Sequence, residues 1–127
     1  MPAYHVWFAT KRRKWLLQGD VAEVAKDTMR TVAKETNIGL KECETMVDHV
    51  HLLVEAENRM YLAKAINLLK GTSSRRLLHQ FPDLKLDAQV KSFWQHRYGA
   101  KEIPESATAA VGQYIRTQWH RLDKYER

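Results

Sequence analysis

The sequence predicts an α+β fold built on a four-stranded antiparallel sheet with two helices on one of its faces. Strand-forming and helix-forming segments follow one another in the order β-α-β-β-α-β-α along the 127 residues. The first long helical segment carries apolar side chains on one face and charged ones mostly on the other, so it has one face to bury against a sheet. This order matches the ferredoxin-like split β-α-β arrangement, followed by one additional C-terminal helix.

Residues 1–46 predict two strands with a helix between them. The segment AYHVWFAT at residues 3–10 is rich in aromatic and other strand-forming side chains, and the basic turn KRRK follows it. Asp20 is the expected N-cap of a helix that runs to about Thr36 and ends at residues 37–39 (NIG). Residues 40–46 (LKECETM) alternate weakly and predict the second strand. The expected apolar face of the helix comprises Val21, Val24, Ala25, Thr28 and Val32.

Residues 47–55 (VDHVHLLVE) predict the third strand, which a tight turn at Asp48 joins to the second. Side chains alternate across a strand, so Val50, Leu52 and Val54 are expected to face the helices. The other face of the strand, which the helices leave open, then carries two neighbouring imidazoles, those of His49 and His51. Two adjacent imidazoles can hold one metal ion, but such a pair on a strand is more often two ordinary histidines.

The second half of the chain predicts two more helices and the fourth strand. A helix is expected from about Met60 to Gln80, with residues 81–83 (FPD) ending it. Gly71 should weaken this helix midway, because glycine costs about 1 kcal/mol relative to alanine in a helix. Residues 92–98 predict the fourth strand, and Ser106 is the expected N-cap of a last helix to about residue 125. The inward residues of the longer helix are Leu62, Ile66, Leu69 and Leu77.

The composition indicates a single domain, residues 1–127, with 44% apolar residues and a formal charge of +6. The single cysteine, Cys43, excludes an internal disulfide and is typical of a reducing compartment. No signal-peptide pattern is present, and no apolar run approaches the roughly 20 residues of a transmembrane helix. These features predict a soluble, cytoplasmic protein.

Positive charge is concentrated in two segments that lack acidic residues, 1–19 and 58–82. Segregated positive charge is typical of a protein that binds a polyphosphate such as nucleic acid, whereas a solvated basic surface is the alternative. Gly71 and two serine hydroxyls beside the second group of cations favour phosphate contacts. The candidate DNA-binding residues are Lys11, Arg12, Arg13, Lys14, Lys70, Ser73, Ser74, Arg75 and Arg76.

The last predicted helix carries a second candidate group of functional residues. Tyr114 and Gln118 are four residues apart, so they share one face of the helix. The split β-α-β arrangement needs only two helices, so this third one must cover another surface. Its adjacent apolar stripe would dock it and bring Tyr114 and Gln118 towards the histidines; the stripe comprises Val111, Ile115, Trp119 and Leu122.

These segments together resemble the HUH single-tyrosine transposases, the small TnpA-like enzymes of bacterial insertion sequences. The resemblance runs along nearly the whole chain and rests on four segments in the family's order. They are YHVW followed by KRR, DHVHLL at residues 48–53, LKG with SSR at residues 69–75, and Tyr114-Ile115 with Gln118. Two departures concern the subgroup rather than the chemistry: Val47 stands where a proline is common, and Arg97 where a serine is common.

The resemblance implies a metal-dependent DNA strand transferase. His49, His51 and Gln118 would hold a divalent metal, magnesium or manganese, and Tyr114 would attack single-stranded DNA. A phenol is a weak nucleophile near neutral pH, and a nearby cation favours its phenolate. Attack would leave a 5′-phosphotyrosine, which a second 3′-hydroxyl can resolve without ATP. The resemblance further implies recognition of a DNA hairpin at insertion-sequence ends, and a homodimer in which each terminal helix completes the partner's histidine site.

Three other functions remain open on the sequence alone. The chain is also compatible with a host-resident relative of these enzymes that acts on palindromic repeats. A non-catalytic binder of single strands would use the open sheet face, although the third strand offers histidines where such modules carry aromatics. A zinc hydrolase would need a third histidine and a base such as Asp48 or Glu55. We expect the remaining histidines to be structural or solvent-facing; they are His5, His79, His96 and His120. We expect the tryptophans to lie in the core or an interface; they are Trp7, Trp15, Trp94 and Trp119.

Overall fold

The computed structural model describes residues 1–87 and 91–117. The strands are β1 (Ala3–Ala9), β2 (Gly39–Thr45), β3 (His49–Glu55) and β4 (Gly99–Ile103), and the helices are α1 (Gly19–Glu35), α2 (Arg59–Gln80), α3 (Asp83–Asp87) and α4 (Thr108–Arg116). The strands form one antiparallel sheet in the order β2-β3-β1-β4. This confirms the predicted fold class, to which the structure adds the short helix α3.

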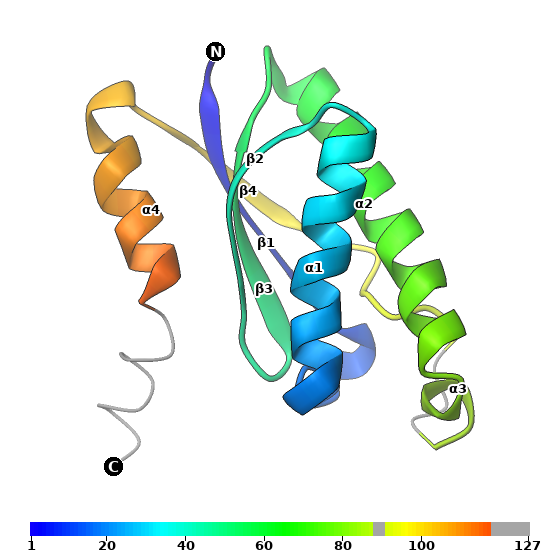
Figure 1. Ribbon diagram of the computed structural model, residues 1–127. Coiled ribbons are helices and arrows are strands. Elements are labelled where there is room, and N and C mark those ends of the chain that lie inside the picture. The colour runs from blue at the N-terminus through cyan, green and yellow to red at the C-terminus, as the bar shows by residue number, and fades with distance from the viewer. Residues whose placement is uncertain (88–90, 118–127) are drawn as a thin grey trace.

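The main core lies between the sheet and the two long helices, which cover one side of the sheet (Figure 1). Val50, Leu52 and Val54 of β3 have no solvent exposure and face α1 and α2, as their alternation predicted. The inward side of α2 is also as predicted, since all four residues assigned to it are buried. These are Leu62, Ile66, Leu69 and Leu77.

The opposite side of the sheet is covered in part by α4, which lies across from α1 and α2 (Figure 1). A second, smaller apolar cluster holds it there, and Ile115 of α4 is fully buried in that cluster. Arg116 at the end of α4 also pairs with Glu42 on β2. The additional helix therefore covers the face of the sheet that the split β-α-β arrangement leaves open. The cluster consists of Ala3, Leu53, Ile103 and Ile115.

The predicted fourth strand at residues 92–98 is wrong, because β4 begins at Gly99. The segment makes one isolated bridge, between Trp94 and Thr10, and otherwise connects to β4 as a loop. Phe93 and Trp94 are consecutive and both are buried in the main core. A regular strand would point two consecutive side chains to opposite faces, so this stretch cannot pair regularly and bury both on one side.

The loop is instead held by two serines of α2, Ser73 and Ser74. The Trp94 indole Nε1 donates to Ser73 Oγ at 2.8 Å, and the Phe93 amide donates to Ser74 Oγ at 2.9 Å. α2 runs without a break through Gly71. These two buried hydrogen bonds join α2 to the segment that leads into the edge strand β4.

Two predicted helix starts are wrong by one or two residues. The N-cap of α1 is Gln18, without a capping side chain, and Asp20 lies in the first turn, where its carboxylate faces the positive end of the helix dipole. Ser106 belongs to a 3-10 turn, Glu105–Ala107, and α4 begins at Thr108. The predicted end of α1 is confirmed, since Asn37 takes the left-handed conformation with φ of 61°. The prediction that the last helix continues to about residue 125, through Gln118, Trp119, His120 and Leu122, falls outside the described residues.

The structure also bears on the single cysteine and on the question of a membrane-spanning helix. Cys43 on β2 is a free thiol, and burial raises its pKa to about 12, so it carries almost no thiolate at neutral pH. Among the helices within residues 1–87 and 91–117, none has the length and apolarity that crossing a bilayer requires.

Replacing Ser73 with alanine removes the acceptor of the buried Trp94 indole N–H. We expect the free energy of unfolding to fall by about 1–3 kcal/mol, the cost of leaving a buried donor unsatisfied. Urea denaturation followed by tryptophan fluorescence measures this change. Thr72→Ala on the same helix is the control, expected within about 0.5 kcal/mol of wild type. Equal stability of Ser73→Ala and wild type would contradict the role assigned to this hydroxyl.

Candidate functional site

The two histidines of β3 lie side by side on the sheet face opposite the main core. The ring centroids of His49 and His51 are 5.0 Å apart with an interplanar angle of 79°. On the neighbouring strand β1, Ala9 pairs with His49 and Trp7 pairs with His51. Cross-strand partners share a face, so β1 contributes His5, Trp7 and Ala9 to the surface that carries the two histidines.

A polar partner engages the Nδ1 atom of each of these two histidines. His49 Nδ1 lies 2.7 Å from Asp48 Oδ1, and the same carboxylate accepts from Arg13 Nε at 3.1 Å. His51 Nδ1 lies 2.9 Å from His5 Nε2. Metal-binding histidines are commonly oriented in this way, by a hydrogen bond to the ring nitrogen that does not bind the metal. With Nδ1 engaged on both rings, the Nε2 atoms are the ones left to bind a ligand, and two neighbouring imidazole nitrogens are chemically suited to a divalent metal.

The charges of the site favour neutral imidazole at His51. Burial, followed by the charges of His49 and His5, lowers the pKa of His51 to about 4. Burial and the charge of Lys101 lower the pKa of His5 as well. When both rings are neutral, His51 can carry its proton on Nδ1 and donate it to His5 Nε2. This tautomer leaves a lone pair on His51 Nε2. Burial alone would raise the pKa of Asp48, but its hydrogen bond with His49 and the charge of Arg13 outweigh this and lower it.

The structure brings Tyr114 to the same face of the sheet. The ring centroids of Tyr114 and His5 are 6.3 Å apart in an edge-on arrangement. The neighbouring Ile115 is buried against the sheet, while 38% of Tyr114 remains exposed. Gln118, the other predicted residue of this helix, lies outside the described residues.

The two histidines are the candidate metal ligands that lie within residues 1–87 and 91–117. Across these ranges, no cluster of three or more histidine, cysteine or acidic side chains is placed to hold a metal ion. The two carboxylates that a zinc hydrolase would need as a base are both engaged. Asp48 is held by His49 and Arg13, and Glu55 pairs with Lys41 at 3.5 Å. His5, which sequence reasoning assigned no specific role, is used as the partner of His51.

Three of the nine candidate DNA-binding residues are turned into the fold. Lys70 is 8% exposed, and its Nζ donates to the carbonyl oxygens of His96 and Arg97 at 2.8 and 3.2 Å. Burial lowers the pKa of Lys70. The buried hydroxyls of Ser73 and Ser74 accept from residues of the following loop. These side chains therefore anchor residues 93–97, which corrects the expectation that they face a phosphate backbone.

The other candidate cations remain at the surface. Arg12 and Arg13 are exposed in the 3-10 turn Lys11–Arg13, where both have positive φ values of 57° and 52°. Arg75 and Arg76 are exposed on α2, and Arg76 pairs with Glu35 at 2.9 Å. A hollow of about 420 Å³ between these two regions is lined by Lys11, Lys70, Arg75, Lys91 and His96 among others. This hollow thus joins Lys11 of the turn and Arg75 of α2 in one lining.

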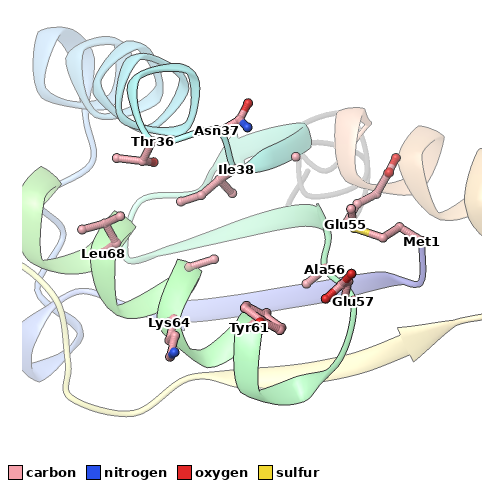
Figure 2. Close-up of a pocket in the computed structure, with 12 residues that line it drawn as sticks. Met1, Thr36, Asn37, Ile38, Glu55, Ala56, Glu57, Tyr61, Lys64 and Leu68 are labelled. Atoms are coloured by element: carbon pink, nitrogen blue, oxygen red, sulfur yellow. The ribbon is translucent and has the colours of Figure 1, made fainter.

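A second hollow, of about 460 Å³, adjoins the histidines, and Trp7, Arg97 and Tyr98 contribute to its lining. Sequence reasoning gave these residues no part in binding a ligand, although the alternation of β1 already placed Trp7 on the face of His5. Trp94 is in the core as expected, whereas Trp7 and Trp15 are exposed. A further hollow of about 540 Å³ lies elsewhere, where Ile38, Tyr61 and Leu68 line it together with two carboxylates (Figure 2).

Comparisons with known proteins agree on one family. The family described as "Transposase IS200 like" matches residues 2–118. The ISDra2 transposase TnpA of Deinococcus radiodurans is 32% identical over 115 residues, which cover 91% of this chain and 82% of that protein. A crystal structure of a Deinococcus radiodurans R1 protein, described as a transposase, has a TM-score of 0.74 and 34% identity, covering 93% of this chain and 92% of the other. A REP-associated tyrosine transposase bound to a REP hairpin shares the fold, with a TM-score of 0.62, 14% identity, and coverage of 91% and 65%.

Proposed function

This chain belongs to the family of IS200-like transposases, and on that basis we propose that it cuts and rejoins single-stranded DNA at insertion-sequence ends through Tyr114. One observation carries the proposal. The sheet face that holds His49 and His51, each oriented through its Nδ1 atom, also holds Tyr114 of α4. The greater identity with the ISDra2 enzyme than with the REP-associated enzyme favours an insertion-sequence element over a host-resident relative.

In the proposed reaction Tyr114 is the nucleophile. Its phenolic oxygen bonds to the scissile phosphorus, the bond from phosphorus to the 3′-oxygen breaks, and a 3′-hydroxyl is released. The resulting 5′-phosphotyrosine keeps the energy of a phosphodiester, so a second DNA 3′-hydroxyl can attack it and restore the tyrosine. Cutting and rejoining therefore need no ATP.

We propose that His49 Nε2, His51 Nε2 and the amide oxygen of Gln118 hold the divalent metal, magnesium or manganese. When bound there, the metal would polarise the scissile phosphate and offset its developing charge. Asp48 and His5 fix the orientation of the two imidazoles, and burial keeps His51 neutral and able to bind a cation. Imidazoles alone also suit zinc, so the choice of metal rests on the resemblance.

The surface cations are proposed to hold the DNA backbone. They comprise the basic turn with Arg12 and Arg13 and the exposed arginines of α2, on either side of the 420 Å³ hollow. The structurally similar REP-associated enzyme was solved with a DNA hairpin, which supports hairpin recognition by this fold. Arg13 also bonds Asp48, so a phosphate that competes for Arg13 would act on the carboxylate that orients His49.

We further propose a homodimer in which α4 of one subunit completes the histidine site of the other. In the single chain α4 lies on its own sheet, held by the small cluster around Ile115, which is separate from the main core. Because this cluster is separate, the helix could leave this position without opening the main core, and exchange of an identical element between subunits is a low-cost route to a dimer. The turn at Glu105–Ala107 precedes α4 and is a suitable hinge.

The proposed nucleophile is tested by incubating the protein with single-stranded DNA from the element's ends and Mg²⁺ or Mn²⁺. We expect a covalent adduct on a denaturing gel with wild type and none with Tyr114→Phe, because the variant lacks the attacking oxygen. Tyr61→Phe, an exposed tyrosine of α2, should form the adduct as wild type does. An adduct that persists in Tyr114→Phe would remove this residue from the chemistry.

The shared site is tested with mixed dimers of Tyr114→Phe and His49→Ala. If α4 acts on the partner, one of the two sites in the mixed dimer has an intact histidine pair and an intact tyrosine, so cleavage returns. If α4 acts within its own chain, every site lacks one component and no cleavage returns. Homodimers of each variant are the inactive controls.

The role of His5 is tested through metal affinity, without DNA. His5→Ala should weaken Mn²⁺ binding, measured by electron paramagnetic resonance, by about 10- to 100-fold, because His51 loses the group that orients it. His5→Gln, whose amide oxygen can accept from Nδ1 of His51, should restore part of the affinity. His79→Ala, an exposed histidine of α2, is the control. Unchanged affinity in His5→Ala would mean that His51 needs no such partner.

A further inference from the structure

Two exposed aromatic side chains border the hollow beside the histidines, and the proposed reaction gives them no role. Trp7 of β1 is 40% exposed and Tyr98, just before β4, is 37% exposed. Both line the hollow of about 460 Å³ that His49 and His51 also line. This volume lies within the range of about 300–1,000 Å³ that ligand sites occupy.

The indole of Trp7 is held in place by the strand beside it. Trp7 pairs with Gly99, and a Cβ atom at position 99 would lie 2.2 Å from Cε2 and 2.3 Å from Nε1 of the indole. The ring therefore rests directly against the backbone of Gly99, where no other residue type leaves room. On the same strand, the His5 ring centroid lies 5.1 Å from that of Trp7. An aromatic surface that is already ordered loses little conformational entropy when a ligand stacks on it.

The segment 95–98, which also lines the hollow except at His96, is anchored from the core side. Lys70 donates to the carbonyl oxygens of His96 and Arg97, and its Nζ lies 6.0 Å from the centroid of the Tyr98 ring. The Gln95 amide donates to the Ala9 carbonyl of β1 at 2.8 Å. The backbone of this segment is thus held at both ends, while the guanidinium-bearing side chain of Arg97 is exposed.

We propose that this hollow binds an unpaired nucleobase of the DNA strand, next to the phosphate that the histidine site receives. This inference rests on the proposed function and adds a base-binding subsite to it. Trp7 is the stacking platform, because an aromatic ring accepts the face of any base. Arg97 and Gln95 supply hydrogen-bonding groups for the polar edge of the base, and Arg13 on the rim supplies a cation for the neighbouring phosphate.

The experiment compares binding of an oligothymidylate with binding of an abasic strand of the same length, by fluorescence anisotropy in EDTA. Trp7→Ala should weaken oligothymidylate binding by about 5- to 100-fold and leave the abasic strand unchanged, because only stacking is lost. Trp7→Phe should keep most of the affinity. Gly99→Ala should weaken oligothymidylate binding as well, since its methyl group displaces the indole without removing it. Tyr61→Ala, an exposed aromatic on α2 that lines the hollow of Figure 2, should bind both strands as wild type does.

Equal oligothymidylate binding by wild type and Trp7→Ala would overturn the proposal, and so would an equal loss for the abasic strand. If Trp7→Ala does not fold by circular dichroism, the pair Trp7→Phe and Gly99→Ala decides the question. The outcome is separable from that for Tyr114, because binding in EDTA needs neither metal nor cleavage. If Trp7→Ala loses affinity for oligothymidylate alone and wild type forms no covalent adduct, the base subsite is supported and strand transfer is refuted. If wild type forms the adduct and Trp7→Ala binds both strands as wild type does, strand transfer is supported and the base subsite is refuted.

Discussion

The pairing of β1 with β3 at the centre of the sheet is the constraint on which both the core and the candidate site depend. The register Phe8↔Val50 and Trp7↔His51 sends Phe8 and Val50 to the helices and keeps Trp7 and His51 on the other face. A shift of one residue would reverse the faces of β1 relative to β3. It would bury an imidazole or expose a core side chain, and it would part His5 from His51. The stability of the core therefore also enforces the geometry of the site.

A second link runs from α2 through the edge of the sheet to the hollow beside the histidines. Lys70, Ser73 and Ser74 use their polar groups on residues 93–97 rather than on solvent. Buried polar groups are costly unless paired, and within the described part of the chain no fully buried side-chain nitrogen or oxygen lacks a partner. The loop is thus specified by three hydrogen-bonded side chains on one helix, and α2 supports from behind the residues that line the hollow beside the histidines. Substitutions in α2 would reach the site through this loop.

The helix that carries Tyr114 is attached more lightly than the rest. Its cluster around Ile115 is distinct from the main core, and its ion pair with Glu42 is at the surface. In the proposed reaction Tyr114 would have to approach and leave DNA, and a small docking cluster is compatible with such movement. The imidazoles, by contrast, sit on the central strands of the sheet, where their orientation is fixed by Asp48 and His5. The site therefore combines a rigid half and a half that is easier to displace.

The sequence by itself determined the order of the elements, the inward face of α2 and the two faces of β3, because these follow from periodicities of a few residues. It also predicted that His49, His51 and Tyr114 would lie on one sheet face, which follows from the alternation of β3 and from the apolar stripe of α4. Only the tertiary structure decided the start of β4, since the burial of both Phe93 and Trp94 depends on serines of α2. Three other features likewise depend on strand register and on partners distant in the chain. They are the burial of Lys70, the hydrogen bond between His5 and His51, and the exposed indole of Trp7 over Gly99. Local patterns carry no information on such partners until the sheet has been assembled.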